Sequence, residues 1–293
     1  MFQHLLICTD FNDGIERLIK FVPQLAQSGA QKLVFLHSVP LDGGGEIPQA
    51  DRKAIQAAQE VLAPALKHGA VGVEVVVEVD SGNADRAILA AVQKHAIDLV
   101  IFGSSTRSLL TQKLFGSTAS SLASKLNCPL LTLRPPVIST YTEAELALRC
   151  QNLLAELLVP YDGSRSAHHT LSQIKQRVTQ HPQTGLKGCI LVWVIDTASR
   201  FPKDEAEVKA KLGAAKADLE SVGLKVETRL LRGLPMEQLM RAATVENISA
   251  IALSDSKPNR LLDWSVSSFG TEVLRQSWHP VLFFPPDESA KMP

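Results

Sequence analysis

Short, continuous apolar runs alternate along the chain with longer amphipathic stretches. In the first half, the apolar runs predict five strands near residues 4–9, 32–38, 72–79, 98–102 and 129–133. The amphipathic stretches predict helices near 13–28, 51–68, 83–95 and 117–126, with apolar residues recurring at three- and four-residue steps. Because strands that are apolar throughout are covered on both faces, the alternation predicts an α/β fold with a doubly wound parallel sheet.

The same pattern returns in the second half, with strands predicted near 153–159, 188–195, 224–231, 248–253 and 280–284. Asp10 in LLICTDFND matches Asp162 in LLVPYDGSR, 152 positions later. Four further anchors keep the same order at offsets of 151 to 156, namely Ser38 with Val194, Gly82 with Gly233, Gly103 with Ser254, and Pro129 with Pro280. So long a period predicts two tandem copies of a five-stranded domain, since solenoid repeats are far shorter.

The predicted domains are residues 1–136 and 150–286. The prolines at 135 and 136 end the last strand of the first copy, because proline cannot continue a strand ladder. We expect the segment 134–152 to be a connector that can form a short helix.

Composition and charge narrow the classes of function. The 293 residues carry 30 Lys and Arg against 30 Asp and Glu, which gives no reason to expect a nucleic-acid or membrane partner. The four cysteines form no CxxC pair and no zinc-type spacing, so we expect reduced core thiols and no metal site. The apolar start is too short for a signal peptide and no run could cross a bilayer, so we expect a cytoplasmic protein.

Candidate binding residues follow strands one, two and four, because ligands of open parallel sheets bind beyond the carboxyl ends of strands. The strongest signal is GSSTRSLLTQKLFGST at 103–118. Gly103 ends the fourth strand, and 116–118 opens the last helix with unpaired N–H groups and hydroxyls that can hold an anion. Simpler interpretations remain open: Ser117 as an ordinary N-cap, Asp10 as a turn aspartate and His37 as a satisfied rim histidine.

Taken in order, these residues resemble the universal stress protein domain. Its motifs are an aspartate after strand one, Gly-x-x-Gly-x9-Gly-[Ser/Thr] after strand four, and Cys-Pro-apolar-Leu at strand five. Here they correspond to Asp10, residues 103–117 and residues 128–131, and VPYDGS at 159–164 with Pro-Val-Leu at 280–282 resembles the same family. The resemblance implies a Rossmann-like fold of the adenine nucleotide alpha hydrolase-like type in both halves.

The resemblance also implies binding of ATP or a related adenine nucleotide, with Mg²⁺ arriving with the phosphates. Its first-copy contacts would be Asp10, Ser38, Gly103, Thr106, Gly116, Ser117 and Thr118. Thr106 stands where the family has its second glycine. The second copy departs further, because serines replace the outer glycines of its loop and Asp255 adds a negative charge near the expected phosphates, which Lys257 could offset. We therefore expect the first copy to be the main nucleotide site.

The expected function is a stress-response protein that binds the nucleotide as a regulatory or sensing module. The alternative is a nucleotide-free protein-interaction scaffold of the same fold. The sequence shows no paired carboxylates and no nucleophile–base set, so we expect no enzymatic activity beyond weak ATP hydrolysis. Because family members pair through the last strand, 129–133 and 280–284 are expected to form an intramolecular pseudo-dimer, which could dimerise again.

Overall fold

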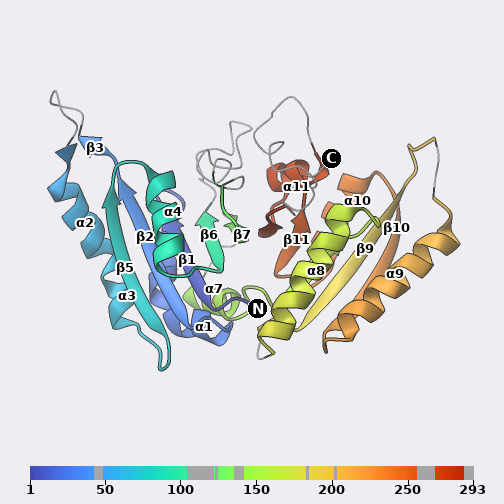
Figure 1. The fold of residues 1–293 in the computed structure, drawn as a ribbon, viewed down its shortest axis with the longest axis horizontal. Helices are drawn as coiled ribbons and strands as arrows, with labels where there is room; N and C mark the ends of the chain where they lie inside the picture. Colours follow the sequence, from blue (N-terminus) through green and yellow to red (C-terminus); the bar gives the residue numbers. More distant parts are fainter. Residues whose placement is uncertain are drawn as a thin grey trace. The chain divides into compact units, whose positions relative to one another are not determined.

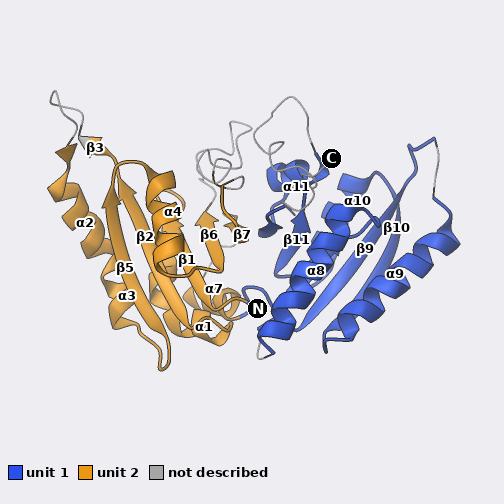
Figure 2. Cartoon of the chain, viewed as in Figure 1, with its two compact units in different colours: residues 1, 152–293 blue, residues 2–151 orange. Residues whose placement is uncertain are grey.

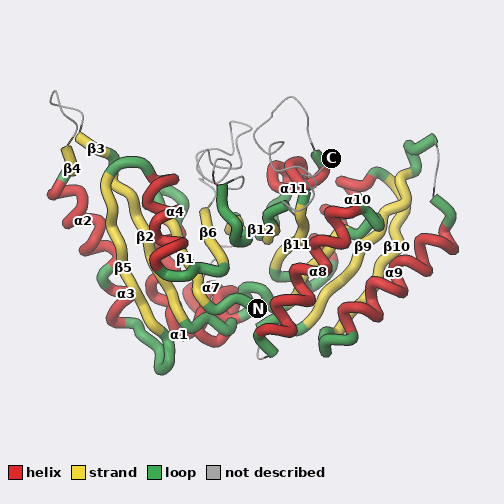
Figure 3. Tube along the Cα trace, in the orientation of Figure 1, coloured by secondary structure: helices red, strands yellow, loops and turns green. Residues whose placement is uncertain are grey.

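The computed structural model describes residues 1–42, 49–103, 122, 125–134, 142–182, 185–200, 203–255 and 268–286. The chain divides into two compact units, residues 2–151 and residues 152–293 together with Met1 (Figure 2). Both units combine parallel strands with helices, as the trace coloured by secondary structure shows (Figure 3). The predicted α/β fold class is confirmed.

The strands of the first unit are β1 (His4–Thr9), β2 (Lys32–Val39), β5 (Glu74–Ser81), β6 (Leu99–Gly103) and β7 (Leu130–Leu133). Their order is β7-β6-β1-β2-β5, and all four pairings are parallel (Figure 1). The direction in which strands are added reverses at β1. In such sheets the crevice beside the reversal is where ligands bind.

The helices of the first unit are η1 (Ile15–Phe21, 3-10), α1 (Val22–Gln27), α2 (Arg52–Leu62), α3 (Pro64–Lys67), α4 (Ala84–Lys94) and α7 (Glu143–Gln151). Two predicted helices are therefore each split in two. Pro23 and Pro64 lie in the first turns of α1 and α3, where proline's missing N–H interrupts the ladder from the preceding turn. Of the predicted helix 117–126, only residues 122, 125 and 126 are described.

Two further features complete the first unit. The short strands β3 (Leu41–Asp42) and β4 (Gln49–Ala50) pair antiparallel. Helix α7, predicted within the connector, packs against α1, and Lys20 Nζ lies 3.1 Å from Glu143 Oε1. The connector helix therefore belongs to the first unit.

The second unit contains β8 (Glu156–Pro160), β9 (Gly188–Asp196), β10 (Lys225–Gly233), β11 (Ala250–Ser254) and β12 (Val281–Phe284). They run parallel in the order β10-β9-β8-β11-β12. Its helices are α8 (Arg165–Gln180), α9 (Glu205–Glu220), α10 (Pro235–Val245) and α11 (Phe269–Gln276). Ser164, Asp204 and Ser268 begin α8, α9 and α11, because each side-chain oxygen accepts a first-turn N–H.

The two units share strand register as well as strand order. Cys8 lies opposite Leu36 in the first unit, and Pro160 lies opposite Val192 in the second. With Asp10 matched to Asp162, these registers match His37 to Trp193. The pairings of β1 with β6 and of β8 with β11 agree in the same way. Equivalent positions at the carboxyl edges of the two sheets can therefore be compared directly.

All four cysteines are free and buried, as predicted. Burial raises the pKa of the Cys150 thiol and of the Cys189 thiol to about 12, which keeps both protonated. Among the residues described above, no helix is both long enough and apolar enough to span a membrane.

Candidate functional site

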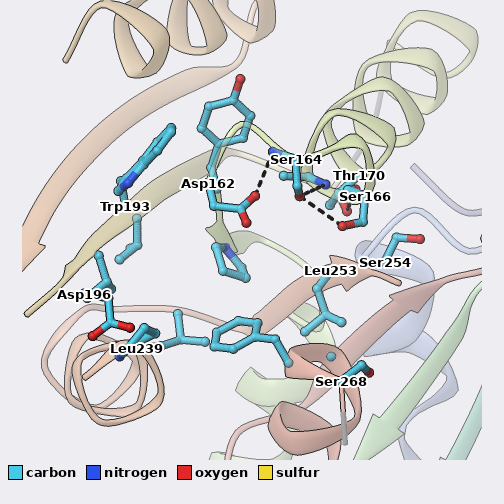
Figure 4. A pocket seen from close by; sticks show the side chains of 18 of the residues that line it. Asp162, Ser164, Ser166, Thr170, Trp193, Asp196, Leu239, Leu253, Ser254 and Ser268 are labelled. Carbon is cyan, nitrogen blue, oxygen red and sulfur yellow. Dashed lines mark hydrogen bonds between the residues drawn. The ribbon is translucent and has the colours of Figure 1, made fainter. Parts of the chain in front are cut away.

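A cavity of about 530 Å³ opens at the carboxyl ends of β8, β9 and β11 in the second unit. Its walls come from these strand ends and from the first turns of α8, α10 and α11 (Figure 4). The cavity lies beside the point where the strand order reverses, between β8 and β11. Both its place and its size are typical of small-molecule sites, which commonly measure about 300–1,000 Å³.

The aromatic wall of the cavity is Trp193, near the end of β9. Its side chain is 2% exposed, and the ring of Tyr161 meets it edge-on at 5.7 Å between centroids. Lys203 Nζ lies 4.6 Å from the centroid of the Trp193 ring, in cation–π geometry. Packing against Tyr161 and Lys203 therefore fixes the orientation of the indole, which forms part of the cavity wall.

The turn after β8 is built around Asp162. The Ser164 N–H donates to Asp162 Oδ1 at 2.8 Å, which makes an Asx turn, and Lys203 Nζ donates to the Asp162 carbonyl at 2.9 Å. Gly163 has a φ of 73°, and a Cβ there would lie 3.3 Å from Cη2 of Trp193. Glycine thus permits both the turn and its close approach to the indole.

Hydroxyl groups line the opposite side of the cavity, on the first two turns of α8 (Figure 4). Ser164 Oγ accepts from the Ala167 N–H and lies 3.1 Å from Ser166 Oγ. Thr170 Oγ1 donates to the Ser166 carbonyl at 3.0 Å. This face offers hydroxyl donors and acceptors to a polar ligand.

A carboxylate lies at the N-terminus of α11. Ser268 Oγ accepts from the Thr271 N–H at 3.1 Å and itself donates to the Asp255 carboxylate. Asp255 is 8% exposed, and its Oδ2 would lie 3.2 Å from a Cβ on Gly270. The chain's own side chain therefore occupies the helix end where an anion would otherwise bind.

The predicted site residues of the first unit fall in two groups. Asp10, Ser38 and Gly103 lie at or just beyond the carboxyl ends of the adjacent strands β1, β2 and β6. The Asn12 N–H donates to Asp10 Oδ1 at 2.8 Å, which is the bond expected of a turn aspartate. Ser38 Oγ donates to the Gly82 carbonyl at 3.2 Å. The remaining predicted residues lie outside the described residues: Thr106, Gly116, Ser117 and Thr118.

In the first unit, Phe11 stands at the position of Gly163, and His37 stands at the position of Trp193. Phe11 adopts a φ of 59°, and its ring stacks on His37 at 4.1 Å with an interplanar angle of 23°. The Nδ1 of His37 donates to the Thr9 carbonyl at 2.8 Å, as the rim-histidine interpretation requires. The second unit has a glycine where the first places this phenyl ring.

Asp13 is buried beneath the same edge of the first unit. Its Oδ1 accepts from Thr9 Oγ1 at 3.3 Å and from the Ile15 N–H at 3.0 Å. A Cβ on Gly103 would lie 2.5 Å from the Asp13 carboxyl group, so the glycine makes room for it. Burial raises the pKa of Asp13 to about 6.

The first half of the chain is similar in sequence to known proteins. Residues 1–134 match the universal stress protein family. Universal stress protein Slr1230 of Synechocystis is 30% identical over 122 residues, which cover 42% of this chain and 40% of that protein's length. The chain thus spans well under half of that relative.

Solved structures show the same fold over nearly the whole chain. A universal stress protein from Archaeoglobus fulgidus superposes with a TM-score of 0.70 at 18% identity, covering 97% of this chain and 98% of that one. The functionally unknown protein PA1789 from Pseudomonas aeruginosa gives 0.59 at 13% identity, covering 99% and 94%. At these identities the likeness establishes the fold.

Replacing Asp13 by asparagine should remove a pH dependence from the stability of the first unit. Because its pKa is raised from 3.8 to about 6, the folded state binds more protons in that window, and the stability from protonation is lost as the pH rises through 6. Asparagine stays neutral and keeps the acceptor oxygen, so at pH 7.5 the variant should be more stable by about 2 kcal/mol. Urea unfolding at pH 4.5 and 7.5 measures the difference.

The matched control for Asp13→Asn is Asp10→Asn, whose side chain is exposed in a turn. Its effect should stay within about 0.5 kcal/mol at both pH values. A stability difference between the Asp13→Asn variant and the unmodified chain that is the same at pH 4.5 and 7.5 would show that Asp13 does not titrate in this window.

Sequence reasoning missed three residues that shape these edges: Phe11, Asp13 and Trp193. The repeat offered a signal for two of them, since the register that matches Ser38 to Val194 also matches His37 to Trp193. In the same way, the match of Asp10 to Asp162 pairs Phe11 with Gly163. Nothing in the pattern marked Asp13, because its burial depends on how the turn after β1 folds under β6.

Proposed function

We propose that this chain is a regulatory or sensing module of the stress response that binds an adenine nucleotide or a related adenine ligand without transforming it. We also propose that residues 150–286 are a second copy of the universal stress protein domain. The shared strand order and register of the two units support this duplication. Pairing of the copies through 129–133 and 280–284, and a location in the cytoplasm, remain part of the proposal.

The observation that carries the ligand proposal is the cavity beside Trp193. An indole in the wall of a cavity at the carboxyl edge of a parallel sheet gives a planar base an apolar neighbour. Hydroxyls of α8 and the carboxylates of Asp162 and Asp196 also line the cavity, and these can bond ribose hydroxyls. The described geometry therefore supports ligand binding in the second half, where the sequence led us to expect weak binding.

The first-half site stays a prediction. Four of its seven residues lie outside the described part of the chain, and Mg²⁺ would come there only with bound phosphates. Around the described three, the Phe11 ring covers His37 and Asp13 packs on Gly103. Within the described residues, no group of three or more His, Cys, Asp or Glu side chains could hold a metal ion.

Two measurements test the function. Mass spectrometry of small molecules released on denaturation should detect an adenine compound. Isothermal titration calorimetry should then show that Asp162→Ala weakens binding at least about tenfold, because the turn that presents the cavity's edge is lost, while the equivalent variant Asp10→Ala changes it little.

Each alternative gives a different result. Loss of binding through Asp10→Ala alone would place the ligand in the first half, as the sequence predicted. No released compound and no heat with any adenine ligand would contradict the proposal and favour the protein-interaction scaffold.

A further inference from the structure

We infer that the cavity of the second unit takes an aromatic ligand without phosphate groups, of the nucleoside class, and discriminates against nucleotides. This inference rests on the proposed function and names the ligand class of the same site. The basis is that four groups of the described lining that could bind a phosphate already bond to an oxygen or a ring of the chain itself.

The first such group is the N-terminus of α11. In a helix that ends a strand–loop–helix connection, this end attracts anions because its N–H groups are unpaired and the dipole is positive there. Here the Ser268 hydroxyl caps the helix and donates to Asp255, which is itself 8% exposed. A phosphate at this end would meet a buried carboxylate within a few ångströms.

The second and third groups are the turns after β8 and β9. The Ser164 N–H at the start of α8 donates to Asp162 Oδ1 at 2.8 Å. The Ala198 N–H after β9 donates to Asp196 Oδ1 at 2.8 Å. Both carboxylates line the cavity, so these two turns present negative charges where their N–H groups could otherwise bind an anion.

The fourth group is Lys203, the one cation among the described lining residues. Its ammonium donates to the Asp162 carbonyl at 2.9 Å and lies over the Trp193 ring. Three aspartates against one lysine leave the described lining with a negative balance. A phosphate dianion would be repelled there, whereas an uncharged base and ribose would find the apolar wall that includes Trp193, hydroxyls and carboxylate acceptors.

Tryptophan fluorescence can report ligand binding in the second unit alone, because all the tryptophans of the chain lie in that half. The chain has three, and Trp264→Phe with Trp278→Phe leaves Trp193 as the single tryptophan, which is excited selectively at wavelengths where tyrosine does not absorb. Titration with adenosine should change Trp193 fluorescence at concentrations at least about tenfold lower than AMP, which corresponds to about 1.4 kcal/mol. ATP with Mg²⁺ should bind no more tightly than AMP.

Asp255→Asn in this background should lower the ratio of the AMP and adenosine dissociation constants at least about threefold, because one repelling charge is removed. Glu220→Gln is the control of equal charge change. It lies at the C-terminal end of α9, and the lining residue Lys203 precedes the opposite end of that helix, so the ratio should stay unchanged.

The outcomes separate this inference from the proposed function. AMP or ATP binding as tightly as adenosine at Trp193 overturns the inference and leaves the function. So does binding seen by calorimetry of the unmodified chain with no change at Trp193, since the ligand would then occupy the first unit. If neither calorimetry nor Trp193 fluorescence detects binding of adenosine, AMP or ATP, the proposed function itself is overturned.

Discussion

Trp193→Ala should lower the free energy of unfolding of the second unit by about 3–5 kcal/mol, the usual cost of truncating a buried aromatic side chain. Trp193 is 2% exposed and packs against Tyr161, Lys203 and the Gly163 backbone, so little can collapse into the space it leaves. Ligand binding in the second unit should be lost as well. Urea unfolding followed by circular dichroism measures the stability change.

Trp278→Ala is the matched control, because it removes the same side chain from the same unit at a position that is 62% exposed. Its effect should stay within about 0.5 kcal/mol. If the two variants were destabilised equally, Trp193 would not be the packed wall of the cavity.

Gly103→Ala should destabilise the first unit by about 3 kcal/mol. The added Cβ would lie 2.5 Å from the Asp13 carboxyl group and 2.6 Å from its Cβ, well inside contact distance. Asp13 could move only by giving up its bonds to Thr9 and the Ile15 N–H, which adds to the cost of overpacking. Thermal unfolding of the variant measures the shift.

Gly213→Ala is the control for Gly103→Ala. Gly213 lies inside α9 with no atom near the place of a Cβ, so alanine should stabilise that helix by about 0.5–1 kcal/mol. A neutral Gly103→Ala would show that Asp13 does not occupy this place. The glycine would then be open to the ligand contact that the sequence suggested.

The strands of both halves were predictable because each is an apolar run bounded by turn residues. The predicted starts and ends lie within three residues of the observed ones. The bounds of the helices were harder to predict. Whether Pro23 and Pro64 split a helix depends on the backbone conformation of the turn that precedes each proline. Helix α7 was foreseen, but its packing on α1 was not, since it depends on tertiary contact.

The site was less predictable than the fold. Sequence order placed Asp10, Ser38 and Gly103 at one sheet edge, and the structure agrees. It could not show that Phe11 adopts a positive φ and covers His37, or that Asp13 is buried under Gly103. It did single out Asp255 as a negative charge at the phosphate end, and the bond from Ser268 shows where that charge lies.

Crystals of the full chain soaked with 8-bromoadenosine test the central claim most directly, because anomalous scattering locates the bromine without further assumptions. We expect a bromine peak in the second-unit cavity beside Trp193. A peak only beside Asp10 and Gly103, or no peak in either unit at a saturating concentration, would contradict it.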